Sequence, residues 1–319
     1  MIWAELTDAG VLGLNRRNRE LIQRFNPRAR LPLADDKIRT KRLCTEEDVA
    51  TPKLLGVIES HSQMSRIPDL VGEASGFALK PAHGAQGNGI LIVTHRAGER
   101  FVSSRGRRLD LGDLRFRVSE ILAGRFSLAG QEDEAFFEEL LQVHPGLAEI
   151  CSGGVPDVRI VVYRGHPVMG MLRLPTERSQ GRANLHKGAV GAGLDLRTGE
   201  LSTAVCEDRF VERHPDTGAP VVGVKVPDFE SLLVQAVRAA DGADLGYVGV
   251  DLVLDAERGP VVLELNARPG LSIQLANESG LRPRLRAVDE ALGAMPDASA
   301  GDRIEFCRAL DGEAWREGA

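Results

Sequence analysis

The sequence contains 319 residues, a length that corresponds to about two domains of ordinary size. Its 40 basic and 46 acidic residues give a formal net charge of −6, which excludes a generically basic nucleic-acid-binding protein. A hydrophobic share of 43% and a charged share of 27% exclude an intrinsically disordered or fibrous chain. No apolar run approaches the roughly 18 residues of a transmembrane helix, and the N-terminal stretch lacks the basic region of a secretory signal.

The first part of the chain is predicted to be helical. A basic amphipathic stretch over 15–26 comes first, and we interpret its arginines as a solvated helix face rather than a phosphate or RNA contact. A second helix is expected from Asp36 to about Asp48, where a Thr-Pro pair ends it. A short strand and a further helix follow over 56–73.

Later segments are mostly apolar strands. The expected elements are strands over 77–80 and 89–93, a helix over 108–124, strands over 157–164 and 167–174, a helix over 228–241, and strands over 247–254 and 260–266. The segment 132–143 is consistent with either a helix or a buried strand, and the tail from Ala298 is weakly patterned. Because strands and helices do not alternate strictly, this order predicts an α+β fold with antiparallel sheets.

The cysteines are widely separated and form no Cys-x-x-Cys pair; they are Cys44, Cys151, Cys206 and Cys307. Four such thiols in a chain of this length are typical neither of a disulfide scaffold nor of a zinc site. We therefore expect reduced, mostly buried thiols and a cytoplasmic protein.

The loop 83–89, with the sequence HGAQGNG, is a candidate phosphate-binding element. Its three glycines allow backbone amides to approach an anion closely. Predicted strands lie on both sides of the loop, whereas a Walker loop or a Rossmann fingerprint joins a strand to a helix. Two interpretations remain open: a hairpin that covers phosphates, with Lys80 on the entering strand, and a plain Asn-Gly hairpin turn.

The predicted hairpin 247–266 is a candidate metal site. If its turn places Asp255 opposite Pro260, then Asp251 lies directly opposite Glu264, and Asn266 shares their face. Two facing carboxylates destabilise a hairpin unless a cation lies between them, and oxygen donors of this kind suit Mg²⁺. The alternative is a charged, solvent-facing side of a half-exposed hairpin.

The loop 179–189, with the sequence SQGRANLHKGA, combines cations with an amide and glycines. Arg182, Asn184 and Lys187 have the chemistry needed to stabilise anionic groups during a reaction. A basic surface loop is the common alternative, and His186 taken alone is more typical of an exposed histidine than of a catalyst.

Together these features resemble the ATP-grasp fold, and within it the RimK-like alpha-L-glutamate ligase homologues. The resemblance covers roughly residues 35–290 and rests on five motifs in order: Asp36-Lys37, Lys80 before the loop 83–89, the Pro-Asp-Val-Arg sequence at 156–159, the stretch 184–188, and the Glu-Leu-Asn-Ala-Arg-Pro-Gly sequence at 264–270. It implies two α+β lobes whose antiparallel sheets grip ATP between them. The implied divisions are a short helical extension over 1–35, an N-terminal lobe over 36–137, a C-terminal lobe over 138–297 and a weakly structured tail over 298–319.

The resemblance also implies roles for individual residues. Nucleotide-binding positions would be Lys37 and Lys80 at the phosphates, Gly84, Gln86 and Gly87 in the closing loop, Glu138, Glu139 and Leu140 in the backbone hinge at adenine, Asp157 near the ribose with Arg159 as its strand partner, and Leu265 beneath adenine. Residues bordering the reacting groups would be Arg173, Arg182, Asn184 and Arg268. The magnesium ligands would be Asp251, Glu264 and Asn266, which agrees with the hairpin register worked out above.

The implied reaction joins a carboxylate to an amine through an acyl phosphate and releases ADP and phosphate. It implies ATP and one or two Mg²⁺ ions, or Mn²⁺ in their place, with glutamate or another amino acid as a substrate. Typical members carry a longer domain ahead of the motif at Asp36, so we expect the acceptor half of the site either to be shortened or to be supplied by a protein partner. Two alternatives remain: an ATP-binding subunit of a larger assembly without ligase activity of its own, and an ATP-grasp phosphotransferase.

Overall fold

The computed structural model describes residues 9–84, 87–127 and 130–310, which divide into two compact units. The smaller unit comprises Asp36–Lys41 and Thr51–Leu141, and the larger comprises the chain up to Asp35, Arg42–Ala50 and the chain from Gln142 onward. Among the described residues, no helix combines the length and the apolar character needed to cross a membrane.

The smaller unit is built on a six-stranded antiparallel sheet. Its strand order is β1 (Leu54–Ile58), β6 (Ala135–Glu139), β2 (Phe77–Pro81), β3 (Leu91–Ala97), β4 (Arg100–Ser103) and β5 (Arg108–Leu109). The segments η2 (His61–Arg66), α6 (Ile67–Val71) and α7 (Leu111–Leu122) supply its helices. The ambiguous segment 132–143 is therefore a strand at its centre, because Phe136 and Phe137 are fully buried in this sheet.

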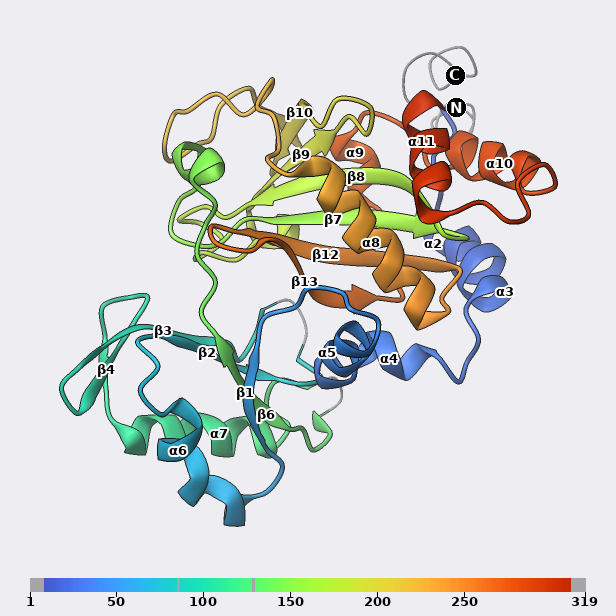
Figure 1. Ribbon diagram of the computed structural model, residues 1–319. Coiled ribbons are helices and arrows are strands. Elements are labelled where there is room, and N and C mark those ends of the chain that lie inside the picture. Colours follow the sequence, from blue (N-terminus) through green and yellow to red (C-terminus); the bar gives the residue numbers. More distant parts are fainter. Residues whose placement is uncertain (1–8, 85–86, 128–129, 311–319) are drawn as a thin grey trace. The chain divides into compact units, whose positions relative to one another are not determined.

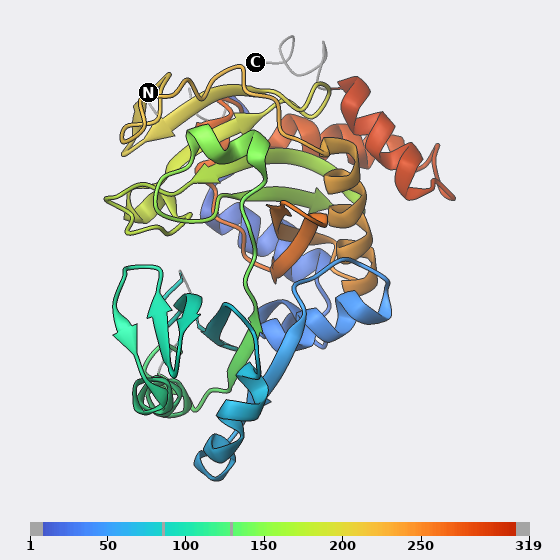
Figure 2. The same ribbon diagram turned by 60° about the vertical axis from the view of Figure 1, so that its left-hand side comes forward.

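Helix α7 covers one face of the six-stranded sheet and is seen along its axis in Figure 2. It begins with a capping box, in which Asp110 and Asp113 each accept a hydrogen bond from the other's backbone N–H. Its apolar face carries Leu114 and Val118, which pack into a core that includes Phe77. Burial of this face stabilises the unit by about 25 cal/mol for each Å² of apolar surface that is removed from water.

The larger unit is built on a seven-stranded antiparallel sheet. Its strand order is β11 (Arg209–Phe210), β10 (Leu201–Cys206), β9 (Val190–Leu194), β8 (His166–Leu174), β7 (Asp157–Tyr163), β12 (Tyr247–Asp255) and β13 (Gly259–Asn266). Helix α8 (Phe229–Ala243) crosses one face of the sheet, as Figure 1 shows. Its buried side chains recur at helical spacing, as the sequence predicts for this segment.

The opposite face of the seven-stranded sheet packs against segments from both ends of the chain. Val161, Tyr163 and Met171 of the sheet share a core with Leu21 and Leu285. The covering segments are α2 (Leu14–Arg16), η1 (Arg17–Ile22), α3 (Gln23–Phe25), α9 (Ser272–Ala276) and α10 (Arg282–Ala291). The remaining helices are α4 (Leu31–Asp35), α5 (Lys37–Glu46), η4 (Pro145–Ile150), η5 (Leu185–Lys187) and α11 (Ala300–Leu310).

Several observed boundaries differ from the expected divisions. The described part of 1–35 is not a separate extension, because Leu12 and Leu21 are buried in the core of the larger unit. The smaller unit ends at Leu141 rather than at residue 137, because β6 continues to Glu139 in its pairing with β2. The expected weakly structured tail contains α11, whose Ile304 is buried against the core that α8 also forms.

All four cysteines lie in the described part of the chain as thiols outside any disulfide, as the sequence predicts. Cys44 and Cys307 are buried, and the other two are partly buried. Burial raises the pKa of the Cys151 thiol to about 12, so this side chain remains protonated and unreactive at neutral pH.

We predict that Leu233→Ala lowers the free energy of unfolding of the larger unit by about 2–5 kcal/mol. The Leu233 side chain is fully buried on α8, and its truncation leaves a cavity against the sheet. The neighbouring Val234 is 37% exposed, so Val234→Ala is the matched control with a change below about 0.5 kcal/mol. Urea unfolding followed by circular dichroism measures both, and equal effects would contradict the assignment of this core.

Candidate functional site

A buried carboxylate paired with two lysines lies at the centre of the smaller unit. Glu138 on β6 is 2% exposed and forms ion pairs with Lys80 on β2 and with Lys41 on α5, the latter at 2.7 Å between Nζ and Oε2. Burial alone would raise the pKa of Glu138, but the two ammonium groups hold it below its usual range. The cluster therefore keeps two cations in place for one anion.

Lys37 lies one helical turn before Lys41 on α5, and it contacts the glycine-rich loop. Its Nζ donates a hydrogen bond of 2.6 Å to the backbone carbonyl of Gly84. The loop is also held at His83, whose backbone N–H and ring Nδ1 both lie within 3.0 Å of Asp133 Oδ1. Of the predicted phosphate contacts, this unit thus brings Lys37 to the loop and Lys80 to the buried carboxylate.

The glycine at position 84 is required by close packing. A Cβ built on Gly84 would lie 2.2 Å from Cγ of Pro81. Gly87 has a φ of +69°, in the left-handed region that favours glycine. The third predicted loop residue, Gln86, lies outside the described residues.

The predicted adenine hinge falls at the end of a central strand. Glu138 is paired with residues of both neighbouring strands, Leu54 and Ala78. Glu139 is paired with Phe77, and its N–H donates to the carbonyl of Lys53 at 3.0 Å. Sheet pairing therefore occupies the backbone of Glu138 and Glu139, and the half-buried Leu140 is the first hinge residue beyond the strand.

A network of two arginines and two aspartates lies on one face of the seven-stranded sheet. Asp251 on β12 is 2% exposed and accepts hydrogen bonds from Arg159 Nε at 2.7 Å and Nη2 at 2.6 Å. Arg173 on β8 donates to the same carboxylate at 2.8 Å and pairs through Nε with Asp157. These groups come from adjacent strands, so strand register alone brings them together.

The network shifts its two carboxylates in opposite directions. Burial would raise the pKa of Asp251, but Arg159 and Arg173 hold it well below its usual range. Burial raises the pKa of Asp157 to about 7. The negative charge of Asp251 also raises this pKa, whereas the positive charge of Arg173 lowers it. The ion pairs therefore keep Asp251 as the permanent anion between the two guanidinium groups.

The β12–β13 hairpin places Asp251 directly opposite Glu264, as the sequence predicts. The turn differs from the expectation, because Asp255 is opposite Gly259 rather than Pro260. A bulge between Asp251 and Leu252 restores the expected pairing further along the hairpin. Bulges of this kind are common beside functional sites, where they reorient side chains.

The predicted magnesium ligands are all oxygen donors, but Asp251 and Asn266 already accept hydrogen bonds from other residues. Glu264 and Asn266 are half-buried, and the amide oxygen of Asn266 accepts the backbone N–H of Arg268 at 2.9 Å. The carboxylate of Asp251 already accepts three hydrogen bonds from arginine, out of about four acceptor positions. Within the described chain, no cluster of three or more His, Cys, Asp and Glu side chains could hold a metal ion. The hard oxygen donors of this trio nevertheless fit Mg²⁺.

The remaining predicted residues lie around the larger unit's sheet. Arg268 is exposed and pairs with Asp35 at 3.2 Å. Asn184 Oδ1 accepts the backbone N–H of His186 and so begins η5, while Arg182 is half-buried in the preceding turn. Leu265 is 2% exposed and belongs to the hydrophobic core on the α8 side of the sheet.

Sequence reasoning missed Lys41, which is 3% exposed. A spacing of four residues places it on the same helical face as Lys37, and this spacing is the signal that could have identified it. It also missed Arg17, whose Nη1 donates to the carbonyl of Pro269 at 2.9 Å and so fixes the loop after β13.

Comparison with known proteins gives one family match over most of the chain. The model of the family described as sugar-transfer associated ATP-grasp matches residues 16–290. A curated relative in Aliivibrio fischeri, a probable alpha-L-glutamate ligase, is 24% identical over 237 residues. The ribosomal protein bS6–L-glutamate ligase of Shigella boydii is 25% identical over 248 residues.

These alignments cover 74% and 77% of this chain, respectively, but only 56% and 60% of the relatives, so the chain spans little more than half of their length. Among solved structures, the ATP-grasp ligase PsnB complexed with minimal precursor has a TM-score of 0.44 and 18% identity, covering 84% of this chain and 63% of that chain. The VanG D-Ala:D-Ser ligase from Enterococcus faecalis has a TM-score of 0.44 and 11% identity, covering 88% and 63%.

We predict that Asp251→Asn lowers the free energy of unfolding by about 3–5 kcal/mol even without metal, because it leaves Arg159 and Arg173 buried without their shared anion. Glu264→Gln, at the half-buried position opposite, is the matched control and should cost less than about 1 kcal/mol. Thermal unfolding in the presence of EDTA measures both variants. Equal stabilities would mean that the aspartate–arginine pairing contributes nothing to the fold.

Proposed function

This chain belongs to the sugar-transfer associated ATP-grasp family, and we propose that it is an ATP-dependent ligase that joins a carboxylate to an amine. Two α+β units with antiparallel sheets provide the framework. The single observation that carries the proposal is the patch on β7, β8, β12 and β13. There, Asp251 lies opposite Glu264 and between two buried arginines. Such a patch offers hard oxygen donors for a cation and fixed positive charge for a phosphoryl group.

The lysines of the smaller unit support the nucleotide part of the proposal. Lys80 and Lys41 both form ion pairs with the buried carboxylate of Glu138. Lys37 is held beside the glycine-rich loop by its hydrogen bond to Gly84. We assign these cations to the phosphates of ATP, and we place the adenine contacts at Leu140 and beyond, where the backbone leaves the sheet.

In the proposed reaction, a carboxylate oxygen attacks the γ-phosphorus of ATP, and the bond from this phosphorus to the β–γ bridging oxygen breaks to release ADP. An amine then attacks the acyl carbon of the acyl phosphate, loses a proton and displaces inorganic phosphate. Negative charge develops on oxygen in both steps. Arg159 and Arg173 are already oriented by carboxylates, so they stabilise this charge with little reorganisation.

Bound Mg²⁺ would offset charge on a phosphoryl oxygen and polarise it. Glu264, Asn266 and the remaining acceptor position of Asp251 would hold the ion. We assign Asp157 to the ribose side, and Arg182, Asn184 and Arg268 to the border of the acyl phosphate. Leu265 packs in the core on the α8 side of the sheet, away from this patch, and is left out of the adenine contacts.

The names of the curated relatives support L-glutamate as one substrate and a protein or peptide as the other. We include both in the proposal, with ATP as the third substrate.

We predict that Glu264→Ala lowers Mg²⁺-dependent ADP release at least about 100-fold, because it removes a hard oxygen donor and its charge. The assay supplies ATP and Mg²⁺ with a panel of carboxylates and amines that includes L-glutamate and short peptides. Glu257→Ala is the matched control, since Glu257 is exposed in the turn of the same hairpin, and its ADP release should match the parent protein.

The mass of the product separates the ligase from the alternatives. Condensation gives a product that weighs the two substrates less one water. A phosphotransferase adds one phosphoryl group, and a binding subunit gives no product. ADP release that is unchanged in Glu264→Ala would contradict the assignment of the metal ligand.

A further inference from the structure

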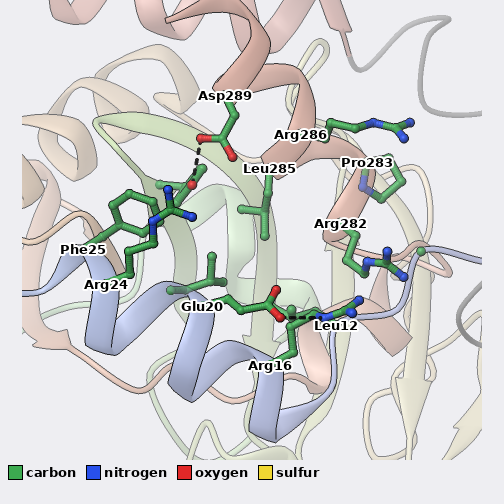
Figure 3. A pocket seen from close by; sticks show the side chains of 13 residues that line it. Leu12, Arg16, Glu20, Arg24, Phe25, Arg282, Pro283, Leu285, Arg286 and Asp289 are labelled. Atoms are coloured by element: carbon green, nitrogen blue, oxygen red, sulfur yellow. Dashed lines mark hydrogen bonds and ion pairs between the residues drawn. The ribbon is translucent and has the colours of Figure 1, made fainter.

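A cavity lies in the larger unit, on the same sheet face as the arginine–aspartate network. It has a volume of about 390 Å³ and opens between the N-terminal helical segments and α10. Its apolar lining comes from Leu12, Leu21 and Leu285, and Tyr163 of β7 reaches its wall. Figure 3 shows Leu285 among the lining side chains, between Arg24 and Arg286.

Arginine dominates the charge of this cavity. Four arginines and two carboxylates line it, which leaves two positive charges in excess in a protein whose formal net charge is −6. The arginines are Arg16, Arg24, Arg282 and Arg286. In Figure 3, Arg282 and Arg286 lie on the side of Leu285 opposite Arg24, so positive charge borders the apolar centre on two sides.

The two carboxylates are already engaged by other side chains. Asp289 accepts hydrogen bonds from Tyr163 Oη at 2.9 Å and from Arg164 at 3.0 Å. Glu20 pairs with Arg16 at 3.2 Å. These contacts offset the negative charges locally, and Arg24 and Arg286 are exposed at the rim. The lining therefore suits a ligand that carries both carboxylates and aliphatic groups.

The aromatic side chain at the rim disfavours a nucleic acid. Guanidinium groups of Arg24 and Arg164 lie 5.0 and 5.2 Å from the centroid of the Phe25 ring. Single-stranded nucleic acids bind largely by stacking bases on open aromatic faces. Two cations already occupy the surroundings of this ring, while the cavity centre is aliphatic. A peptide with acidic and aliphatic side chains fits this lining better.

One helical segment connects the cavity with the loop after β13. Arg16 lines the cavity, and the next residue, Arg17, is buried and donates to the carbonyls of Pro269 and Arg268. Strand β7 also connects the two places, because Asp157 at its start belongs to the arginine–aspartate network and Tyr163 at its end lines the cavity. Six residues of strand correspond to a straight-line separation of about 20 Å, which is the least span that a peptide in contact with both places must bridge.

We propose that this cavity binds an acidic peptide segment, with carboxylates at Arg24, Arg282 and Arg286 and an aliphatic side chain over Leu285. The peptide would belong to the substrate that the larger unit's network acts upon, and this second statement rests on the proposed ligase function. Binding at the cavity would anchor the peptide about 20 Å from the arginine–aspartate network. Such a distal contact raises the effective concentration of the acceptor at the site.

The test measures fluorescence anisotropy of a labelled peptide, Glu-Leu-Glu-Glu-Leu-Glu, with the full chain and without nucleotide. Gln-Leu-Gln-Gln-Leu-Gln and an RNA hexamer serve as comparison probes. The double variant Arg24→Gln/Arg286→Gln should weaken binding of the acidic peptide about tenfold, which corresponds to about 1.4 kcal/mol. The matched control Arg28→Gln/Arg209→Gln removes the same charge from exposed positions outside the cavity and should change binding less than about twofold.

Equal losses in the two double variants would overturn the proposal, because they would indicate non-specific attraction. Equal binding of the glutamine peptide, or tighter binding of the RNA, would also overturn it. ADP release in the presence of the acidic peptide is recorded in parallel. Peptide binding without stimulated ADP release would support the peptide-binding proposal and count against the proposed ligase function. Ligase activity with other amines, in the absence of peptide binding, would overturn the peptide-binding proposal alone.

Discussion

The buried pairing of Asp251 with Arg159 and Arg173 is the interaction on which the larger unit's candidate site depends. Three strands, β7, β8 and β12, each contribute a charge that could not be buried alone without a large desolvation cost. The pairing therefore couples strand register to the position of the guanidinium groups. It also keeps two cations fixed beside Glu264, at the place where we propose that a cation and a phosphoryl group bind.

The smaller unit also contains a buried carboxylate between two cations, with lysines in place of arginines. Glu138 lies between Lys41 and Lys80 and forms an ion pair with each of them. In each unit a buried carboxylate thus orients cations in advance of any ligand. Preorganised charge of this kind stabilises anionic groups without reorganisation during a reaction. It would suit this protein, despite its net charge of −6, to the anionic substrates that we propose for it.

Residues with strong local patterns were predictable from the sequence. Alternation in 247–266 was enough to place Asp251 opposite Glu264, and helical spacing was enough to define α8. The bulge beside Leu252 could not be predicted, because its one-residue shift compensates for the one-residue shift at the turn and leaves the same pairing of Asp251 with Glu264. The partners of Glu138 and Asp251 could not be predicted either, because contacts between distant strands and helices leave no local pattern in the sequence. Helix α11 was missed because its buried face is short and depends on packing against the sheet.

The most direct measurement follows oxygen from the substrate carboxylate into inorganic phosphate. The carboxylate that gives the greatest ADP release is labelled with oxygen-18 and incubated with ATP, Mg²⁺ and the amine. An acyl phosphate transfers one labelled oxygen to phosphate when the amine attacks the acyl carbon, so mass spectrometry should detect singly labelled phosphate in step with the amide product. Unlabelled phosphate in the presence of that product would contradict an acyl phosphate and, with it, the role assigned to the aspartate–arginine network.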